Sequence, residues 1–221
     1  DIPIRNFPKQ PILAIRKDAK NTLLIGIDGQ GIWNISEKGD TILHIYKEDL
    51  NNPFSLRGDG VYDILCDGSK NWIATFTGKL SFFENNNSQI TPVTYQINNP
   101  NSLGNNYVNQ IIEDHEGHIW FATNNGVSRW DAASNKWKHY YQNKSEQAKV
   151  FLSLCEDNQG HIWAGSYSSG IYLLDRETGK TLKHYSSKTN TPGFTGDFIF
   201  DFFVDKEGDV WIGGNQRLSC Y

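Results

Sequence analysis

An internal repeat constrains the fold of this chain more than any other feature. Each copy contains an apolar run, an aspartate, a short turn, a strand-like segment centred on one large apolar residue, a second turn and another apolar run. The five copies are Ile12–Ile35, Val61–Phe83, Val108–Trp130, Val150–Leu174 and Ile199–Tyr221. Their central residues, Leu24, Trp72, Trp120, Trp163 and Trp211, recur at intervals of 48, 48, 43 and 48 residues. Several short strands repeated at this period are typical of the blades of a β-propeller.

One copy and its continuation, Val108 to Tyr141, show the strands of a single repeat. Four β-type runs, at 108–114, 118–123, 127–130 and 136–141, are separated by short polar turns, two of which contain glycine. Glycine supplies the positive φ that tight hairpins need. We therefore predict an all-β propeller with four-stranded antiparallel blades. It forms one domain over residues 1–221, with repeats at approximately 12–49, 61–98, 108–143, 150–187 and 199–221.

Two columns of the repeat have a direct structural interpretation. An aspartate ends the first run of every copy: Asp18, Asp67, Asp114, Asp157 and Asp205. Because there is one per repeat, on separate turns, we expect each to cap its own turn by accepting backbone N–H bonds rather than to hold a metal ion. A small residue follows the central residue by two positions: Gly26, Ala74, Ala122, Gly165 and Gly213. It allows close approach of strands where the wedge between blades narrows.

Composition excludes several functional classes. The formal net charge is −4, with both signs dispersed, so no basic patch for nucleic acid is expected. No apolar run is long enough to cross a bilayer, so this segment should not insert into a membrane. Three cysteines cannot form a complete disulfide framework, and we interpret Cys66 and Cys155 as small buried hydrophobic residues. The chain begins at Asp1 and contains no methionine, as expected for a segment of a longer protein.

The six histidines occupy repeat positions rather than a cluster. His44, His139 and His184 fall in fourth strands, His118 and His161 precede the tryptophan strands, and His115 lies in a turn. We therefore predict no metal site, no cofactor and no catalytic residue. Glycine-rich phosphate loops and Cys–His ligand sets are also absent from the sequence.

Ligand-binding candidates come from the turns between second and third strands, which with the blade-to-blade connections surround one mouth of a propeller channel. They are Asp28, Gln30, Phe76, Thr77, Asn124, Asn125, Tyr167, Ser168, Asn215 and Gln216. Amides and aromatic rings suit sugar hydroxyls and pyranose faces, although each residue alone also fits an ordinary turn. A second group could line the channel: Asp63, Gln110, Ser153 and Asp201. The alternative for these is hydrogen bonding to the backbone of a neighbouring blade.

The repeat resembles the two-component regulator propeller repeat. The closest copies are Val108–Val127, Phe151–Ile171 and Ile199–Gly214, and the connections Asn52–Leu56 and Asn99–Leu103 have the family's Asn-Pro-x-Ser-Leu form. The resemblance implies a periplasmic sensor region of a hybrid two-component system, as in gut Bacteroidetes. In such proteins an immunoglobulin-like domain, a membrane helix, a histidine kinase and a response regulator follow. Many respond to oligosaccharides and regulate glycan utilisation, so an oligosaccharide or other small ligand is the implied partner.

The number of blades in the intact ring has two interpretations. The chain holds four full repeats and three strands of a fifth. We favour part of a larger ring, commonly seven-bladed in this family, whose uncovered end blades would promote self-association. The alternative is a closed five-bladed ring in which residues 1–5 supply the missing outer strand, an edge where Pro3 is tolerated.

Two other functions fit a propeller. Streptogramin lyases share a similar propeller but use histidine with a divalent metal, whereas these histidines do not converge. A lectin-like ring with one sugar site per blade would need equivalent loops, whereas these loops differ. Positions that break the repeat are therefore the better functional candidates. Arg217 is one, because it replaces the turn glycine that we align at Gly31, Gly78, Gly126 and Gly170.

Overall fold

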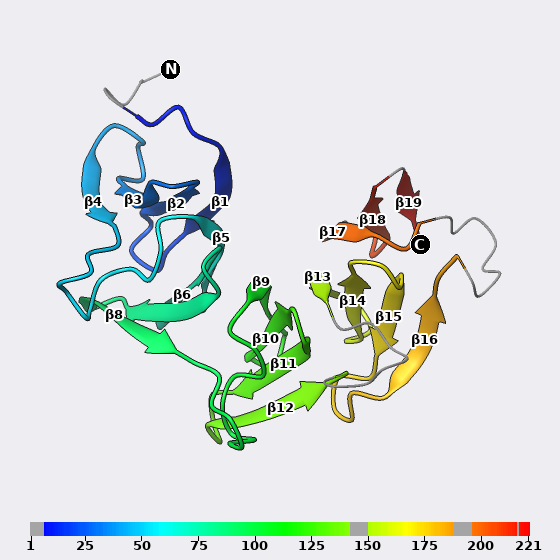
Figure 1. Cartoon of the computed structure of the whole chain (residues 1–221). Coiled ribbons are helices and arrows are strands. Elements are labelled where there is room, and N and C mark those ends of the chain that lie inside the picture. The colour runs from blue at the N-terminus through cyan, green and yellow to red at the C-terminus, as the bar shows by residue number, and fades with distance from the viewer. Residues whose placement is uncertain (1–6, 142–149, 188–195, 216) are drawn as a thin grey trace. The chain divides into compact units, whose positions relative to one another are not determined.

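The described residues fold entirely into strands and turns. The computed structural model describes residues 7–141, 150–187, 196–215 and 217–221, and over these it contains strands and no helix (Figure 1). The strands form four four-stranded sheets and one three-stranded sheet, all antiparallel and each made of consecutive strands. The prediction of an all-β fold with four-stranded antiparallel blades is confirmed. The number of blades in the intact ring stays a prediction, and residues 1–5 lie outside the described residues.

Each sheet corresponds to one repeat. The first contains β1 (Ile12–Lys17), β2 (Leu23–Ile27), β3 (Gly31–Ile35) and β4 (Ile42–Tyr46). The second contains β5 (Val61–Cys66), β6 (Lys70–Thr75), β7 (Lys79–Glu84) and β8 (Asn87–Val93). The third contains β9 (Val108–Glu113), β10 (His118–Thr123), β11 (Gly126–Asp131) and β12 (Lys136–Tyr140). The fourth contains β13 (Phe151–Glu156), β14 (Ile162–Ser166), β15 (Ile171–Leu174) and β16 (Thr181–Tyr185). The fifth contains β17 (Ile199–Val204), β18 (Val210–Gly214) and β19 (Leu218–Cys220).

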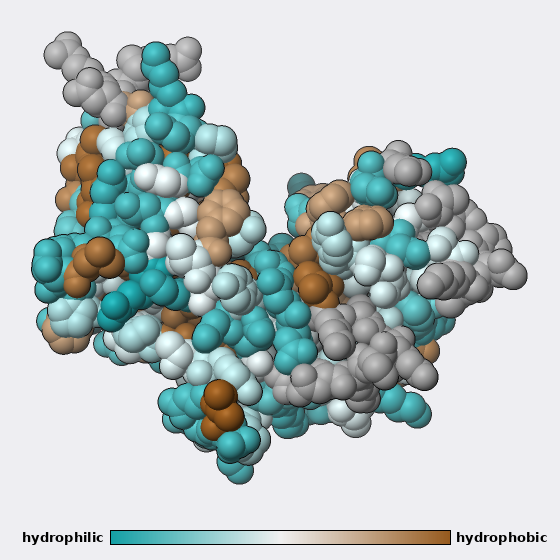
Figure 2. All heavy atoms as spheres, in the orientation of Figure 1, coloured by the Kyte–Doolittle hydropathy of each residue, from teal (hydrophilic) through white to brown (hydrophobic). Residues whose placement is uncertain are grey.

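The chain forms two compact units. The N-terminal unit comprises Asp1–Tyr95 and Asn106–Ile111, and the C-terminal unit comprises Gln96–Asn105 and Ile112–Tyr221. A core in the N-terminal unit joins the first two sheets and includes Leu24, Val61 and Ile64. Cores in the C-terminal unit join the third sheet to the fourth and the fourth to the fifth. On the face drawn in Figure 2, exposed apolar residues form small separate groups on a largely hydrophilic surface.

The aspartate that ends each first strand both caps a turn and holds the central tryptophan. In the third sheet, Asp114 Oδ1 accepts the backbone N–H groups of Glu116 and His118 at 3.0 and 2.9 Å. Its Oδ2 accepts the indole Nε1–H of Trp120 at 2.8 Å. The same indole bond recurs at 2.7–2.9 Å in the pairs Asp67–Trp72, Asp157–Trp163 and Asp205–Trp211. The predicted turn cap is therefore present, and the indole bond is an addition that the sequence pattern did not suggest.

The first sheet replaces this bond with a hydroxyl. Leu24 stands in the tryptophan column and has no donor, and the Thr22 hydroxyl donates to Asp18 Oδ2 at 2.8 Å instead. Asp18 Oδ1 still accepts the N–H groups of Lys20 and Thr22. Both carboxylate oxygens are therefore used in this divergent repeat as well.

The small residue after the tryptophan column admits the first strand of the next blade. A Cβ atom added to Gly26 would lie 2.7 Å from a methyl group of Val61. A Cβ at Gly165 would lie 2.6 Å from a methyl group of Ile199. Within each unit, successive sheets thus pack too closely for a larger side chain, in agreement with the sequence interpretation.

The first strands carry an irregularity that the sequence did not reveal. The register of pairing with the second strand shifts between Ile12 and Ala14, Val61 and Asp63, Phe151 and Ser153, and Ile199 and Asp201. A bulge of this kind redirects the intervening side chain. Tyr62 and Phe200 occupy it and are 40% and 55% exposed.

Replacement of Asp114 tests the double role of the aspartate column. We expect Asp114→Ala to lower the free energy of unfolding by about 2–4 kcal/mol, because the buried Trp120 indole loses its acceptor. Asp18→Ala is the matched control, since it removes the same turn cap but leaves the Thr22 hydroxyl, which water can reach. Urea denaturation of both variants measures the difference. Equal losses would show that the indole bond contributes nothing beyond the cap.

The same carboxylates should make the fold sensitive to acid. Burial acts to raise the pKa of Asp67, Asp114 and Asp157, but hydrogen bonds from N–H donors outweigh it and lower each value. A carboxyl with a lowered folded pKa stabilises the fold fully above its unfolded pKa, about 4. That contribution is lost as the pH falls through the folded value.

We therefore expect the urea midpoint to change little from these groups above pH 5 and to fall steadily below about pH 4. Asp114→Asn removes one of the titrating groups, so its midpoint should fall less steeply over the acidic range. Identical pH profiles for the variant and the unaltered chain would contradict this account.

Candidate functional site

The predicted turn residues lie on separate turns, one per sheet. Asp28, Phe76, Thr77, Asn124, Tyr167, Ser168 and Asn215 are exposed, and Gln30 and Asn125 are partly buried. Gln30 accepts from Lys47 Nζ at 3.1 Å, and the Phe76 ring packs on Tyr62 with centroids 3.8 Å apart. Gln216 lies outside the described residues. A binding role for these residues stays a prediction. Thr77 is one of them that lines a hollow, together with residues that the repeat pattern had not marked as binding candidates.

The predicted channel residues are mostly engaged with backbone. Asp63 Oδ2 accepts the N–H of Ile111 at 2.9 Å, and its Oδ1 accepts from Arg16 Nη2 at 3.0 Å and from the N–H of Ile64 at 2.9 Å. Ser153 donates to the Ile199 carbonyl at 3.4 Å. For these two residues the structure shows the alternative interpretation, hydrogen bonding to the backbone of the next repeat. Gln110 is partly buried, and Asp201 is exposed and accepts the N–H of Phe202.

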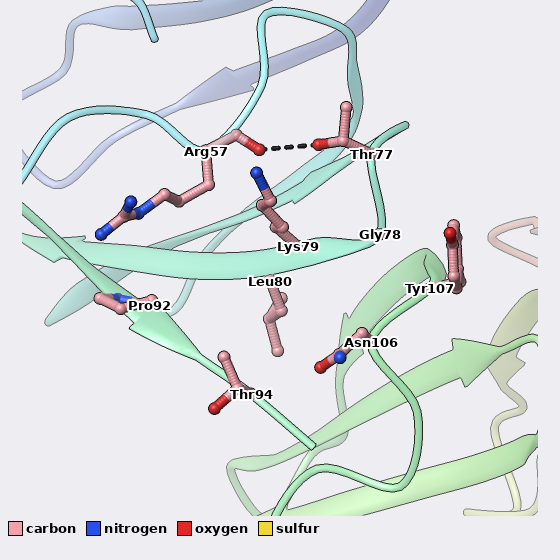
Figure 3. Close-up of a pocket in the computed structure, with 9 residues that line it drawn as sticks. All are labelled: Arg57, Thr77, Gly78, Lys79, Leu80, Pro92, Thr94, Asn106 and Tyr107. Carbon is pink, nitrogen blue, oxygen red and sulfur yellow. Dashed lines mark hydrogen bonds between the residues drawn. The ribbon is translucent and has the colours of Figure 1, made fainter. Parts of the chain in front are cut away.

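The hollow lies in the N-terminal unit and has a volume of about 460 Å³. Three parts of the chain form it: the connection before β5, the β6–β7 turn with the start of β7, and the end of β8 with the connection before β9 (Figure 3). Its lining residues are Arg57, Thr77, Gly78, Lys79, Leu80, Pro92, Thr94, Asn106 and Tyr107. It thus occurs where the sequence predicted a ligand face, at a turn between second and third strands and at blade-to-blade connections.

Hydroxyl groups fix the connection before β5 against the β6–β7 turn. Thr77 Oγ1 donates to the Arg57 carbonyl at 2.8 Å, the bond drawn in Figure 3, and Thr75 Oγ1 donates to the same carbonyl at 3.1 Å. Gly58 has φ +122°, and a Cβ there would lie 2.4 Å from the Thr77 hydroxyl. One wall of the hollow is therefore held by a carbonyl with two donors and by a glycine that admits no side chain.

A second wall depends on contact between Gly78 and Tyr107. Gly78 has φ +69°, and a Cβ there would lie within 2.7–2.9 Å of three atoms of the Tyr107 ring. Tyr107 is 51% exposed. Asn106 Oδ1 accepts the N–H of Tyr95 at 2.7 Å, which fixes the connection before β9 and leaves the amide NH₂ group as a donor for a ligand.

The charged residues among those that line the hollow are the cations Arg57 and Lys79, and Glu48 lies near Lys79. Arg57 donates from Nη2 to the Pro53 carbonyl at 2.7 Å, whereas its buried Nε has no hydrogen-bond partner among the described residues. Lys79 Nζ lies 3.7 Å from Glu48 Oε1, beyond hydrogen-bond distance. The residues that line the hollow therefore offer positive, hydroxyl, amide and aromatic groups.

The strand register corrects the sequence alignment at this site. Lys79 pairs with Thr75, and the residues that pair at the corresponding place in the first and third sheets are Gly31 and Gly126. The β6–β7 turn therefore places its glycine one residue earlier than the alignment assumed, and Lys79 occupies the glycine register. The sequence shows Gly78 and Lys79 side by side, but only the pairing shows which of them breaks the column.

No cluster of three or more metal-ligating side chains occurs among the residues that the structure covers. His118 and His161 contact the capping carboxylates Asp114 and Asp157 at 3.0 and 3.2 Å. His139 and His184 bond to the carbonyls of Pro100 and Ser169. These four histidines have the structural contacts expected from their repeat positions. The described residues include no helix that is long and apolar enough to cross a membrane.

Comparisons with known proteins agree with the repeat. The sequence model described as "two component regulator propeller" matches residues 102–125, 145–168 and 193–216. A comparison with curated proteins finds no match.

Two solved structures show the same fold. The extracellular domain of a B. thetaiotaomicron protein described as a hybrid two-component system has a TM-score of 0.81 and 20% identity, with 97% of this chain and 29% of that chain covered. Virginiamycin B lyase from Staphylococcus aureus has a TM-score of 0.67 and 14% identity, with 98% and 71% covered. At these identities the likeness concerns the fold, and this chain spans about 29% of the first structure.

A double-mutant cycle tests the contact between Gly78 and Tyr107. Gly78→Ala should destabilise the chain by about 2–4 kcal/mol, the sum of left-handed backbone strain and overlap with the ring. In a Tyr107→Ala background the overlap is absent, so the same substitution should cost only about 1–2 kcal/mol. Urea denaturation of the four proteins gives both values. The same cost in the two backgrounds would show that the ring does not rest on Gly78.

Proposed function

Because this chain carries two-component regulator propeller repeats, we propose that it is a ligand-sensing module of a signalling protein. In this proposal the ligand is an oligosaccharide, and its binding regulates glycan utilisation. The module lies in the periplasm and is not itself an enzyme. In the intact protein it is followed by further blades, an immunoglobulin-like domain and a histidine kinase. The fold likeness to an extracellular domain of a hybrid two-component system supports this placement.

The observation that carries the proposal is the hollow beside β7. Its volume of about 460 Å³ falls in the range of small-molecule sites. Sugar hydroxyls both donate and accept hydrogen bonds, and Thr77, Thr94 and the Asn106 amide offer matching groups. The half-exposed Tyr107 ring gives a flat apolar surface for the C–H face of a pyranose.

The two alternative functions receive less support. The likeness to virginiamycin B lyase is one of fold, and fold alone does not give function. A lectin with one site per blade would require the hollow to recur. Lys79 in this hollow occupies a register position that holds glycine in the first and third sheets, so an equivalent site is not expected beside those two sheets.

A thermal-shift screen of the 221-residue chain tests the proposal. We expect at least one tetra- to hexasaccharide from a panel of neutral and acidic plant and host glycans to raise the melting temperature, because it binds the folded state. Tyr107→Ala should weaken that binding about tenfold through loss of stacking. Phe203→Ala, an exposed aromatic on β17 outside the hollow, is the matched control and should bind normally.

The same preparation is assayed for cleavage of virginiamycin B with added Mg²⁺. The sensor proposal predicts no turnover. Absence of a shift with every oligosaccharide would overturn the proposal, and metal-dependent turnover of the antibiotic would favour the lyase instead.

A further inference from the structure

Lys79 stands at a place where the first and fourth sheets allow no side chain. A Cβ at Gly31 would lie 2.1 Å from the Tyr46 carbonyl oxygen, and one at Gly170 would lie 2.0 Å from that of Tyr185. In those sheets the end of the fourth strand therefore lies directly against the glycine. A lysine in the same register requires the chain that follows β8 to run farther away. The residue that introduces the charge is thus also the residue that makes room for a ligand.

The fourth strand of the second sheet also carries a smaller side chain beside the start of the third strand. Val93 pairs with Leu80, whereas tyrosines pair at the corresponding place in the first and fourth sheets. Beyond Val93 the chain continues through Thr94, which lines the hollow. Figure 3 shows the Lys79 and Leu80 side chains on opposite sides of β7, as alternation along a strand requires. The missing aromatic ring adds to the space beside the start of β7.

Arg57 supplies a second positive group whose geometry is partly fixed. Its bond to the Pro53 carbonyl holds one end of the guanidinium, while its buried Nε–H has no acceptor among the residues described. A buried donor without a partner carries a desolvation penalty, so the protein does not fully satisfy this guanidinium. Guanidinium and ammonium groups together form charge-assisted hydrogen bonds with carboxylate or sulfate.

One carboxylate offsets part of this charge. Glu48 Oε1 lies 3.7 Å from Lys79 Nζ, and both side chains are partly exposed, 31% and 46%. An exposed pair at this separation is weak, so a ligand oxygen that reaches hydrogen-bond distance can replace it. Arg57 and Lys79, the charged residues among those that line the hollow, are both cations, which favours an anionic over a neutral ligand.

We propose that the hollow beside Lys79 selects oligosaccharides that carry an anionic group, a carboxylate or a sulfate, which Lys79 and Arg57 bind. The inference rests on the proposed function, in that the hollow is taken to bind a sugar. The sugar ring lies on Tyr107, its hydroxyls bond to the Asn106 amide and Thr94, and the anionic substituent points toward the start of β7.

Calorimetric titration of the 221-residue chain against matched probes tests this. The acidic probes are tetragalacturonate, tetramannuronate and a κ-carrageenan tetrasaccharide. Each is paired with its uncharged counterpart, the methyl esters for the first two and the desulfated sugar for the third. We expect an acidic member to bind at least about tenfold more tightly than its uncharged partner, with the preference falling as salt is raised. The pair that responds shows whether carboxylate or sulfate is the group.

Substitutions then assign the preference to the hollow. Lys79→Gln should weaken the acidic probe about tenfold or more and leave the uncharged probe unchanged. Lys138→Gln, on the exposed surface of β12, is the matched control and should change neither. Arg57→Gln is the second variant and should likewise weaken the acidic probe. An unchanged urea midpoint for Lys79→Gln shows that the fold of this variant is intact.

The outcomes separate the two proposals. Uncharged probes that bind as tightly as acidic ones, or acidic binding that Lys79→Gln and Arg57→Gln leave unchanged, overturn the inference while sugar binding and the sensor function stand. No binding by any sugar overturns both.

Discussion

The bond between the capping aspartate and the tryptophan indole is the interaction on which the rest of the structure depends. In the third sheet one carboxylate accepts two backbone N–H groups of its turn and the indole N–H of Trp120. The turn fixes where the second strand begins, and the indole bond fixes how the largest side chain of that strand is oriented. Trp120 is fully buried, so its only polar group needs this internal acceptor. The first sheet supports the same conclusion, because Thr22 supplies a donor where Leu24 has none.

Because this strand pair is rigid, successive blades contact each other in the same way. Differences between repeats are therefore concentrated in the turns and connections. Gly26 and Gly165 show how little freedom remains in the cores, since one added carbon would overlap the next first strand. At Lys79 the repeated geometry is abandoned and a hollow opens. The energetic cost of departing from the repeat thus falls at the edge of a blade, where the loss of packing is small.

The sequence allowed prediction of every element whose cause is local and repeated. Strands and turn caps follow from columns that five copies share, and the scaffold positions of the histidines follow from their places within the repeat. The indole bond at Trp120 could not be derived, because it depends on the direction of a side chain rather than on spacing. The bulge before Asp63 and the register of Lys79 were also hidden, since each depends on one residue of pairing between strands that the sequence does not specify. The hollow itself requires Val93 to face Leu80, a contact known only once both strands are paired.

The position of the hollow suits a sensor better than the core would. A ligand can shift a conformational equilibrium only by its difference in affinity between two states, so it must touch segments that can differ. The hollow is bounded by Arg57 in the connection before β5 and by Tyr107 in the connection before β9. Asp63 joins the strands that these connections enter, because its carboxylate on β5 accepts the Ile111 N–H of β9. In the proposed function, a ligand held by both connections would act on two consecutive first strands that already share a buried hydrogen bond, without a change in the cores behind them.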